Sequence, residues 1–149
     1  IEKLTNLEKL DLGMNGLAGN LSEWTSIEKL TNLVELNLKY QENYDDLTFL
    51  TGNLSEWTSI EKLTNLKVLF LHQNQLTGNL TEWTSLGKLA KLQKLDLVLN
   101  KLTGNISEWT SIETLAKLQE LHLESNELTG NVSEWTSVEK LINLKVKKV

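Results

Sequence analysis

The sequence contains no cysteine, no proline and no arginine. Without cysteine, the chain has neither a disulfide framework nor thiol chemistry. Without arginine, it lacks the side chain that binds phosphate in a bidentate manner, and its formal net charge of −5 disfavours nucleic acid and anionic lipid as partners. No apolar run is long enough to span a bilayer. These features argue against a disulfide-stabilised domain and against nucleic acid or anionic lipid as a partner, and residues 1–149 contain no membrane-spanning run.

The chain consists instead of one block repeated along almost its whole length, of which GNLSEWTSIEKLTNL is one copy. Successive tryptophans are 26 residues apart, except for the first two, which are 33 residues apart. Self-similarity at such a period is typical of a solenoid, in which each repeat contacts only its neighbours. The tryptophans that mark the repeats are Trp24, Trp57, Trp83, Trp109 and Trp135.

The apolar positions of one repeat follow the order L-x-x-L-x-L-x-x-N-x-L, as in residues 66–76. This order resembles the leucine-rich-repeat family, and the resemblance covers essentially the whole chain. The L-T-G-N-L segment at residues 76–80 resembles the plant-type subclass, but the proline that usually follows is absent and two extra residues accompany the tryptophan. The resemblance implies an α/β fold, namely a right-handed solenoid with a parallel concave sheet, short helical or 3-10 segments on the convex side, and no cysteine caps.

We expect residues 1–149 to form a single array of about five and a half repeats. A seven-residue insertion lies within residues 40–50 and accounts for the longer first spacing. Neither end has a recognisable capping repeat, which would leave open sheet edges. The sequence therefore predicts that the chain is part of a longer array or assembly.

Two polar patterns accompany the apolar one. Asparagine recurs at positions 15, 74, 100 and 126, where the chain turns off each predicted strand, and an internal asparagine there is expected to form a ladder of hydrogen bonds to the backbone. The T-S-I-E segments predict capping boxes, in which a threonine such as Thr25 begins a short helix and Glu28 bonds back to it. The equivalent pairs are Thr58 with Glu61, Thr110 with Glu113, and Thr136 with Glu139.

The tryptophan column has two interpretations. Trp24 and its equivalents precede the next apolar residue by three positions, a helical spacing that favours a buried column whose indole N–H groups bond to backbone carbonyls. The alternative is an exposed aromatic ribbon that stacks on sugars. Fluorescence emission distinguishes the two.

The concave face is the first candidate binding surface, because the repeats differ most from one another there. Apolar residues near its middle would form a patch surrounded by charge. The competing interpretation is unconstrained drift at exposed positions. The predicted binding residues on this face are Val34, Tyr40, Val68, Phe70, His72, Val98, Leu99 and His122.

The insertion is the second candidate, since a loop that interrupts a regular array often projects from the binding face. It carries Tyr44, Asp45 and Asp46, which we add to the predicted binding residues. A tolerated loop without function is the alternative.

Each repeat also contains one N-x-S/T sequon for N-glycosylation. Duplication copies such a motif without selection, yet Thr81 replaces serine and keeps the motif intact. Because a helix cap would also tolerate Asp or Asn, a column restricted to Ser and Thr favours covalent N-glycans. The predicted sites are Asn20, Asn53, Asn79, Asn105 and Asn131.

An enzymatic function is disfavoured. Asp96 and His122 occupy the same position of adjacent predicted strands, with Ser125 nearby, but nothing indicates an oxyanion hole or an enclosing pocket. The spacing of His122, Glu124 and Asp96 matches no specific metal motif. We therefore predict neither a cofactor nor a metal.

The sequence thus predicts a non-enzymatic recognition or scaffold module, secreted or at the cell surface. Its partner would be a protein or a glycan, bound through the concave face and the loop at residues 40–50. The alternative is a structural protein, in which copies stack end to end into an N-glycosylated extracellular filament.

Overall fold

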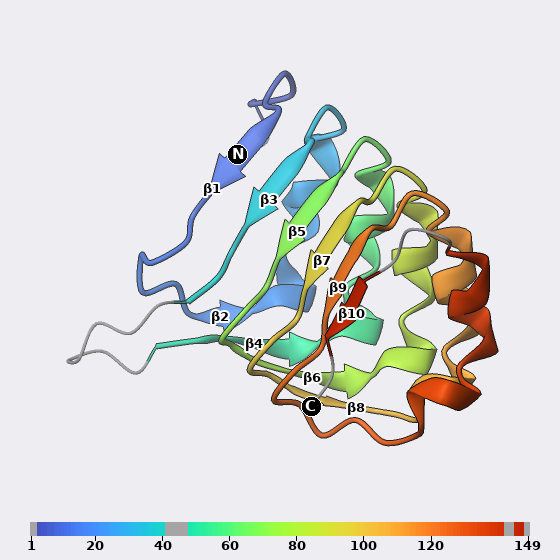
Figure 1. The fold of residues 1–149 in the computed structure, drawn as a ribbon. Coiled ribbons are helices and arrows are strands. Elements are labelled where there is room, and N and C mark those ends of the chain that lie inside the picture. The colour runs from blue at the N-terminus through green and yellow to red at the C-terminus, as the bar shows by residue number, and fades with distance from the viewer. Residues whose placement is uncertain (1–2, 41–47, 142–144, 148–149) are drawn as a thin grey trace.

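The computed structural model describes residues 3–40, 48–141 and 145–147. The chain winds as a coil in which every turn contributes a strand to a first sheet, an extended segment to a second sheet, and two 3-10 turns (Figure 1). The predicted insertion residues 41–47, with Tyr44, Asp45 and Asp46, lie outside the described residues. The solenoid predicted from the sequence is confirmed.

Within the described residues, the first sheet has six parallel strands in the order β1-β3-β5-β7-β9-β10. In β3, β5, β7 and β9 the central leucine is buried against the coil interior, while the two flanking side chains of β5, for example, lie on the outer face and are half-buried. The strands are β1 (Lys9–Asp11), β3 (Glu35–Asn37), β5 (Val68–Phe70), β7 (Lys94–Asp96), β9 (Glu120–His122) and β10 (Lys145–Lys147).

The second sheet runs along the adjacent side of the coil, where it begins after the turn that follows each strand of the first sheet (Figure 1). Within the described residues it has four parallel strands. They are β2 (Gly19–Asn20), β4 (Leu50–Asn53), β6 (Gln75–Asn79) and β8 (Lys101–Thr103).

The two sheets differ in register. In the first sheet equivalent residues of consecutive repeats pair directly, as Leu36 does with Leu69, so they lie about 4.8 Å apart. In the second sheet Gly52 pairs with Leu76, two residues before its equivalent Gly78. That offset separates equivalent residues by about 8 Å, given a rise of roughly 3.3 Å per residue. The difference in spacing curves the stack toward the first sheet, which is therefore the predicted concave sheet.

The remaining side of each turn consists of two consecutive 3-10 turns, which stack on the side of the coil opposite the first sheet (Figure 1). None of the helices in the described part of the chain has the length and apolarity needed to cross a bilayer. The shorter turns are η1 (Leu21–Glu23), η3 (Leu54–Glu56), η5 (Leu80–Glu82), η7 (Ile106–Glu108) and η9 (Val132–Glu134). The longer turns are η2 (Thr25–Lys29), η4 (Thr58–Lys62), η6 (Thr84–Lys88), η8 (Thr110–Thr114) and η10 (Thr136–Lys140).

The predicted capping boxes are wrong. The longer turns have tryptophan, not threonine, at the N-cap, and that residue makes no side-chain capping bond. The physical reason is that Trp24 closes η1 through its own N–H, which donates to Leu21 O, so η2 starts immediately afterwards with Thr25 as its first residue. The side-chain cap lies one turn earlier, where Asn20 Oδ1 accepts from Ser22 N at 3.0 Å.

The predicted burial of the tryptophan column is confirmed for four members. Trp57, Trp83, Trp109 and Trp135 are at most 1% exposed, whereas Trp24 in the first repeat is half-buried. Burial at that level excludes an exposed ribbon that stacks on sugars. The predicted N–H to carbonyl bonds are wrong for Trp57, Trp83 and Trp109, whose indole nitrogens have no hydrogen-bond partner in the described part of the chain. Trp135 Nε1 donates to Trp109 O at 3.4 Å.

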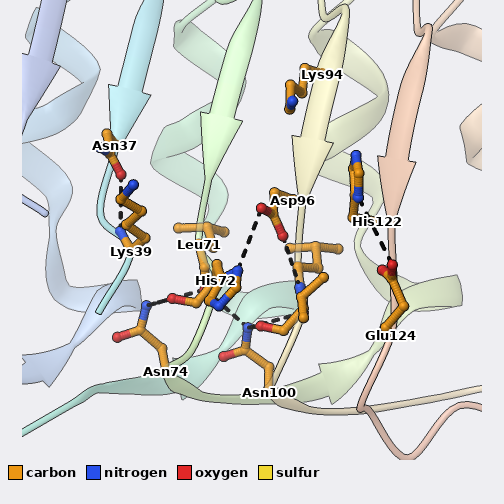
Figure 2. Close-up of polar contacts among 12 residues, drawn as sticks. Asn37, Lys39, Leu71, His72, Asn74, Lys94, Asp96, Asn100, His122 and Glu124 are labelled. Atoms are coloured by element: carbon orange, nitrogen blue, oxygen red, sulfur yellow. Dashed lines mark hydrogen bonds and ion pairs between the residues drawn. The ribbon is translucent and has the colours of Figure 1, made fainter. Parts of the chain in front are cut away.

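The asparagine ladder forms in the later repeats. Asn100 Nδ2 donates to Leu71 O of the preceding repeat (Figure 2) and to Leu97 O of its own. Asn100 Oδ1 accepts from Leu76 N. Asn74 and Asn126 make the equivalent bonds. Asn15 departs from the prediction, because it is exposed and, among the described residues, donates only to Gly13 O within its own turn.

Candidate functional site

The outer face of the first sheet contains a hollow of about 270 Å³ near the end of β5. Phe70 ends β5, so its side chain lies on the outer face of the sheet, next to buried Leu69. His72 and Gln73 follow β5, Tyr40 lies at the equivalent turn of the preceding repeat, and Asp96 ends β7. Together with Lys39, these residues line what we call the hollow.

Aromatic rings form the apolar part of the hollow. Tyr40 is only 7% exposed and its ring packs against Phe49, with centroids 4.5 Å apart and a tilt of 48°. The ammonium group of Lys94 lies 5.6 Å from the Phe70 ring centroid, close enough for a cation–π contact. These contacts hold both rings in place before any partner arrives.

The rim of the hollow is polar. His72 Nδ1 lies 3.6 Å from Asp96 Oδ2, and Asp96 Oδ1 accepts from Val98 N at 3.1 Å (Figure 2). Lys39 occupies the opposite side, where its backbone N–H donates to Asn37 Oδ1. The rim therefore offers a carboxylate, an imidazole, an amide and an ammonium group to a partner.

Most charges on the neighbouring strands are paired across the sheet. Lys94 Nζ lies 2.6 Å from Glu120 Oε2, and its hydrogen bond, helped by His122, lowers the pKa of the Glu120 carboxyl below its ordinary value. Lys9 Nζ lies 2.8 Å from Glu35 Oε1, and this bond raises the pKa of the Lys9 ammonium. Because these side chains are partly exposed to solvent, the pairs contribute little stability, but they fix the position of charges on the outer face of the first sheet.

The hollow brings together three of the predicted binding residues, Tyr40, Phe70 and His72. Val68 lies on the same face, in register with Glu35 and Lys94. Val34 precedes β3 and does not line the hollow; its carbonyl accepts from Lys67 N and Val68 N.

The other predicted binding residues lie beyond the hollow. Val98 is half-buried beside Asp96, and Leu99 is 44% exposed with a φ of 56°, a left-handed conformation that is unusual for a bulky side chain. His122 lies in β9, where its ring nitrogens are 3.4 Å from Glu120 Oε2 and 4.0 Å from Glu124 Oε1.

The predicted set omitted three lining residues, Lys39, Gln73 and Asp96. All three lie on the variable outer face, but they are polar, and the prediction favoured apolar members. The signal that identifies them is their place in the repeat, since each is within a few residues of the end of a strand in the first sheet.

The catalytic arrangement considered from the sequence does not form. Asp96 contacts His72 rather than His122, although Asp96 and His122 are register partners. Ser125 is exposed and has a φ of 56°. In the described part of the chain, no group of three His, Asp or Glu side chains is placed to hold a metal ion.

A second, larger hollow of about 770 Å³ lies where the longer 3-10 turns lead back to the first sheet. Glutamates and lysines that pair with each other supply its charge, as in the 2.8 Å contact between Lys62 and Glu61. It has no aromatic residue among its lining side chains, so we do not treat it as the candidate site. The lining residues are Thr5, Glu28, Lys29, Thr31, Glu61, Lys62, Thr64 and Lys88.

Comparisons with known proteins find similar leucine-rich-repeat structures, several of them receptor ectodomains. The structure is similar to the leucine-rich-repeat ectodomain of the receptor kinase SOBIR1 from Arabidopsis thaliana, with a TM-score of 0.70 and 26% identity over 93% of this chain and 66% of that one. It is similar to the plant peptide hormone receptor RGFR1 in complex with RGF2, with a TM-score of 0.51 and 26% identity over 83% of this chain and 25% of that one.

A third similar structure is that of the Arabidopsis receptor kinase HAESA in complex with the peptide hormone IDA and the co-receptor SERK1. Its TM-score is 0.65, with 24% identity over 97% of this chain and 26% of that one, and this likeness concerns the fold alone. The present chain thus spans between about a quarter and about two thirds of the length of these structures. No protein-family model matches the sequence, and the comparison with curated proteins finds no match.

Proposed function

The chain is a leucine-rich-repeat protein, and on that basis we propose that it is a non-enzymatic, extracellular recognition module that binds an extended segment of a protein partner. The partner lies across the outer face of the first sheet and inserts one apolar or aromatic side chain into the hollow. The observation that supports this proposal most directly is the hollow itself, with its Phe70 and Tyr40 rings inside a polar rim.

The size of the hollow favours a protein side chain over a free small molecule. Sites for drug-sized ligands usually have volumes of about 300–1,000 Å³ and bury most of the ligand. The hollow, at about 270 Å³, is below that range and lies on the surface of a sheet. A hollow of this size suits a single anchoring residue, and anchors of that kind dominate the energy of protein interfaces.

The chemistry of the rim favours a peptide backbone beside that anchor. Lys39 and Gln73 offer donors, and the Asp96 carboxylate and the Gln73 amide oxygen offer acceptors. An extended peptide presents both N–H and C=O groups, which can bond to such a rim while its side chain fills the apolar centre. Interfaces with an apolar core and a polar rim have this composition.

The comparisons agree with a protein partner. RGFR1, which shares 26% identity with this chain, is a peptide hormone receptor solved with RGF2. The SOBIR1 structure is an ectodomain, which agrees with an extracellular location. No observation of the described residues specifically favours a glycan partner or end-to-end assembly, so these two alternatives become outcomes of the test.

The test is a selection of binders from a random peptide library displayed on yeast, with the purified chain as the target. We expect selected peptides to share one apolar or aromatic residue, and we expect Phe70→Ala to weaken their binding about 30-fold, the loss typical of a 2 kcal/mol anchor site. Thr103→Ala, an exposed residue of the second sheet, is the matched control and should leave binding unchanged.

A second variant distinguishes a loss of binding from a loss of folding. Lys39→Ala changes the rim without touching the aromatic centre and should weaken the same peptides about tenfold, while the thermal unfolding curve stays close to that of the wild type. Equal binding to wild type and Phe70→Ala would contradict the proposal. So would binding confined to an oligosaccharide array, or growth of filaments with concentration in light scattering.

A further inference from the structure

The sequons lie on a different part of the coil from the hollow, at the junction between the second sheet and the shorter 3-10 turns. Strands β2, β4 and β6 end at the sequon residues Asn20, Asn53 and Asn79, respectively. In the last two repeats, Asn105 pairs with Thr129 in an isolated bridge and Asn131 is the N-cap of η9. The geometry points to a column of N-glycans at these five asparagines, which would cover the second sheet and leave the outer face of the first sheet bare.

The two polar atoms of each asparagine side chain have different surroundings. Asn53 Oδ1 faces the coil, where it accepts from Ser55 N at 3.0 Å and from Ser55 Oγ at 2.8 Å. Asn53 Nδ2 points away and donates to Glu56, an exposed side chain, at 3.4 Å. Asn20, Asn79 and Asn105 repeat this arrangement.

The orientation matters because the sugar of an N-glycan is attached to Nδ2. The oxygen stays an acceptor after attachment, so both bonds from the serine survive. The nitrogen keeps one hydrogen and loses at most its contact with the exposed glutamate. Glycosylation therefore costs the fold very little at these positions.

The serine or threonine of the sequon has a structural role as well. Its hydroxyl donates to the asparagine oxygen in the first four copies, with Thr81 in place of serine in the third. A carboxylate side chain lacks a hydrogen to donate, which explains why Asp never replaces Ser or Thr in this column. The recurrence of the motif is thus explained by the fold, and the proposal depends on the outward direction of Nδ2.

The register of the second sheet provides room for the sugars. Each asparagine pairs with the threonine of the next repeat, as Asn53 does with Thr77, so the next sequon asparagine, Asn79, is two residues further along. Successive sequons are consequently about 8 Å apart, compared with about 4.8 Å for equivalent residues in the first sheet. Equivalent residues are therefore close together on the concave face, whereas the glycan attachment sites on the second sheet are further apart.

The sugars would also point away from the hollow. Strand β6 runs from Gln75, just after the hollow residue Gln73, to the sequon Asn79, a distance of roughly 13 Å for four extended steps along the strand. The second sheet faces a different side of the coil from the first (Figure 1). Lys101 lies on the second sheet in register with Thr77, whereas the exposed Lys67 immediately precedes β5 of the first sheet.

The proposal is tested on the chain secreted from cultured insect cells. Intact mass is measured before and after treatment with peptide N-glycosidase, which leaves aspartate at each site that carried a glycan. We expect a loss of mass and aspartate at all five sequon asparagines, namely Asn20, Asn53, Asn79, Asn105 and Asn131. An unchanged mass, or aspartate at Asn131 alone, would overturn the proposed column.

A matched pair of variants assigns one site. Ser55→Ala removes both the sequon and the hydroxyl bond, and Ser55→Thr keeps both, as Thr81 does in the next repeat. We expect the alanine variant alone to lose one glycan. Loss in both variants, or in neither, would contradict the assignment of Asn53.

The predicted coverage has its own measurement, acetylation of lysines followed by peptide mass analysis. Removal of the glycans should raise the reactivity of Lys101 several-fold and leave that of Lys67 unchanged. An equal change at both lysines would overturn the separation of the two faces. Neither measurement uses a binding partner, so a failure here is distinct from a failure of the proposed recognition function.

Discussion

At the scale of single residues, the buried asparagines show why a polar side chain belongs in this apolar coil. Asn100 is 8% exposed and uses both ends of its amide, with bonds to Leu71 O, Leu97 O, Val98 O and Leu76 N. The turn between the two sheets leaves Leu71 O and Leu97 O without strand partners, whereas Val98 O also accepts from Gln73 N at 2.8 Å. The side chain satisfies them in place of water, which is excluded from the interior.

Asn100→Ala should therefore lower the free energy of unfolding by about 3 kcal/mol, because several buried backbone groups lose their partner at once. Asn15→Ala is the matched control, since Asn15 is exposed and its one bond within the described part of the chain is to Gly13 O, and it should cost less than about 1 kcal/mol. Urea unfolding followed by circular dichroism measures both values. Similar losses in the two variants would show that burial does not set the contribution of this position.

At the scale of secondary-structure elements, the strands of the second sheet fit together through glycine. Gly78 has a φ of 114°, and a Cβ there would collide with Asn53 Oδ1 of the preceding repeat. Gly52, Gly104 and Gly130 have the same contact with the preceding sequon asparagine. The absence of a side chain lets each sequon asparagine keep its oxygen turned inward, next to the following strand.

Gly78→Ala combines two costs, a strained φ and a collision, whereas Gly19→Ala has only the first. Gly19 has a φ of 122°, and no atom of the described residues lies within 4 Å of a Cβ built there. We expect Gly19→Ala to cost about 1–2 kcal/mol and Gly78→Ala to cost a further 1–3 kcal/mol or so from overpacking. Thermal unfolding of the two variants gives the difference, and equal destabilisation would show that the strand moves without penalty.

At the scale of the whole molecule, the coil is a stack of nearly equivalent turns whose contacts are with their neighbours. Every strand of the first sheet pairs with the strand of the adjacent repeat, and the longer 3-10 turns stack in the same order. Stability in such a stack is approximately a sum over repeats and their interfaces. One complete repeat can thus be removed without changing the character of the remaining contacts.

Deletion of residues 80–105, a full 26-residue period, joins Asn79 to Ile106 and recreates the natural Asn105–Ile106 sequence. We expect this shorter chain to fold with a lower unfolding midpoint and an unchanged shape of its circular dichroism spectrum, because register and core columns are kept. Deletion of residues 80–92, half a period, is the control and should not fold. Folding of the half-period deletion would contradict a register set by the repeat.

Much of the fold follows from the sequence because its apolar columns are strictly periodic. The positions of Leu66, Leu69 and Leu71 in one repeat predict a strand and a turn, and all three are fully buried. The threonine caps were predicted wrongly because the T-S-I-E motif is the same whether or not another 3-10 turn ends directly before it. When such a turn ends there, the N-cap position belongs to the residue that closes that turn. The 3-10 turn that ends at Trp24 removes Thr25 from that position.

The candidate site could be predicted only in part. Phe70 and His72 stand out in the sequence, since apolar and imidazole side chains are unusual on an exposed sheet face. Lys39 and Asp96 do not stand out, because charged residues are common at exposed positions. Their contribution depends on neighbours that are distant in the sequence, such as the 3.6 Å contact between Asp96 and His72.

The sequence by itself determined the repeat, its buried leucines and tryptophans, and the order of sheet and turn. The reason is that a strictly periodic set of apolar side chains is buried when identical coils stack on one another. The tertiary structure alone decided the register of the two sheets, which residues meet in the hollow, and which atom of each sequon asparagine faces outward. Those features arise from pairing between repeats, where a shift of two residues leaves every local pattern unchanged and still moves side chains by several ångströms.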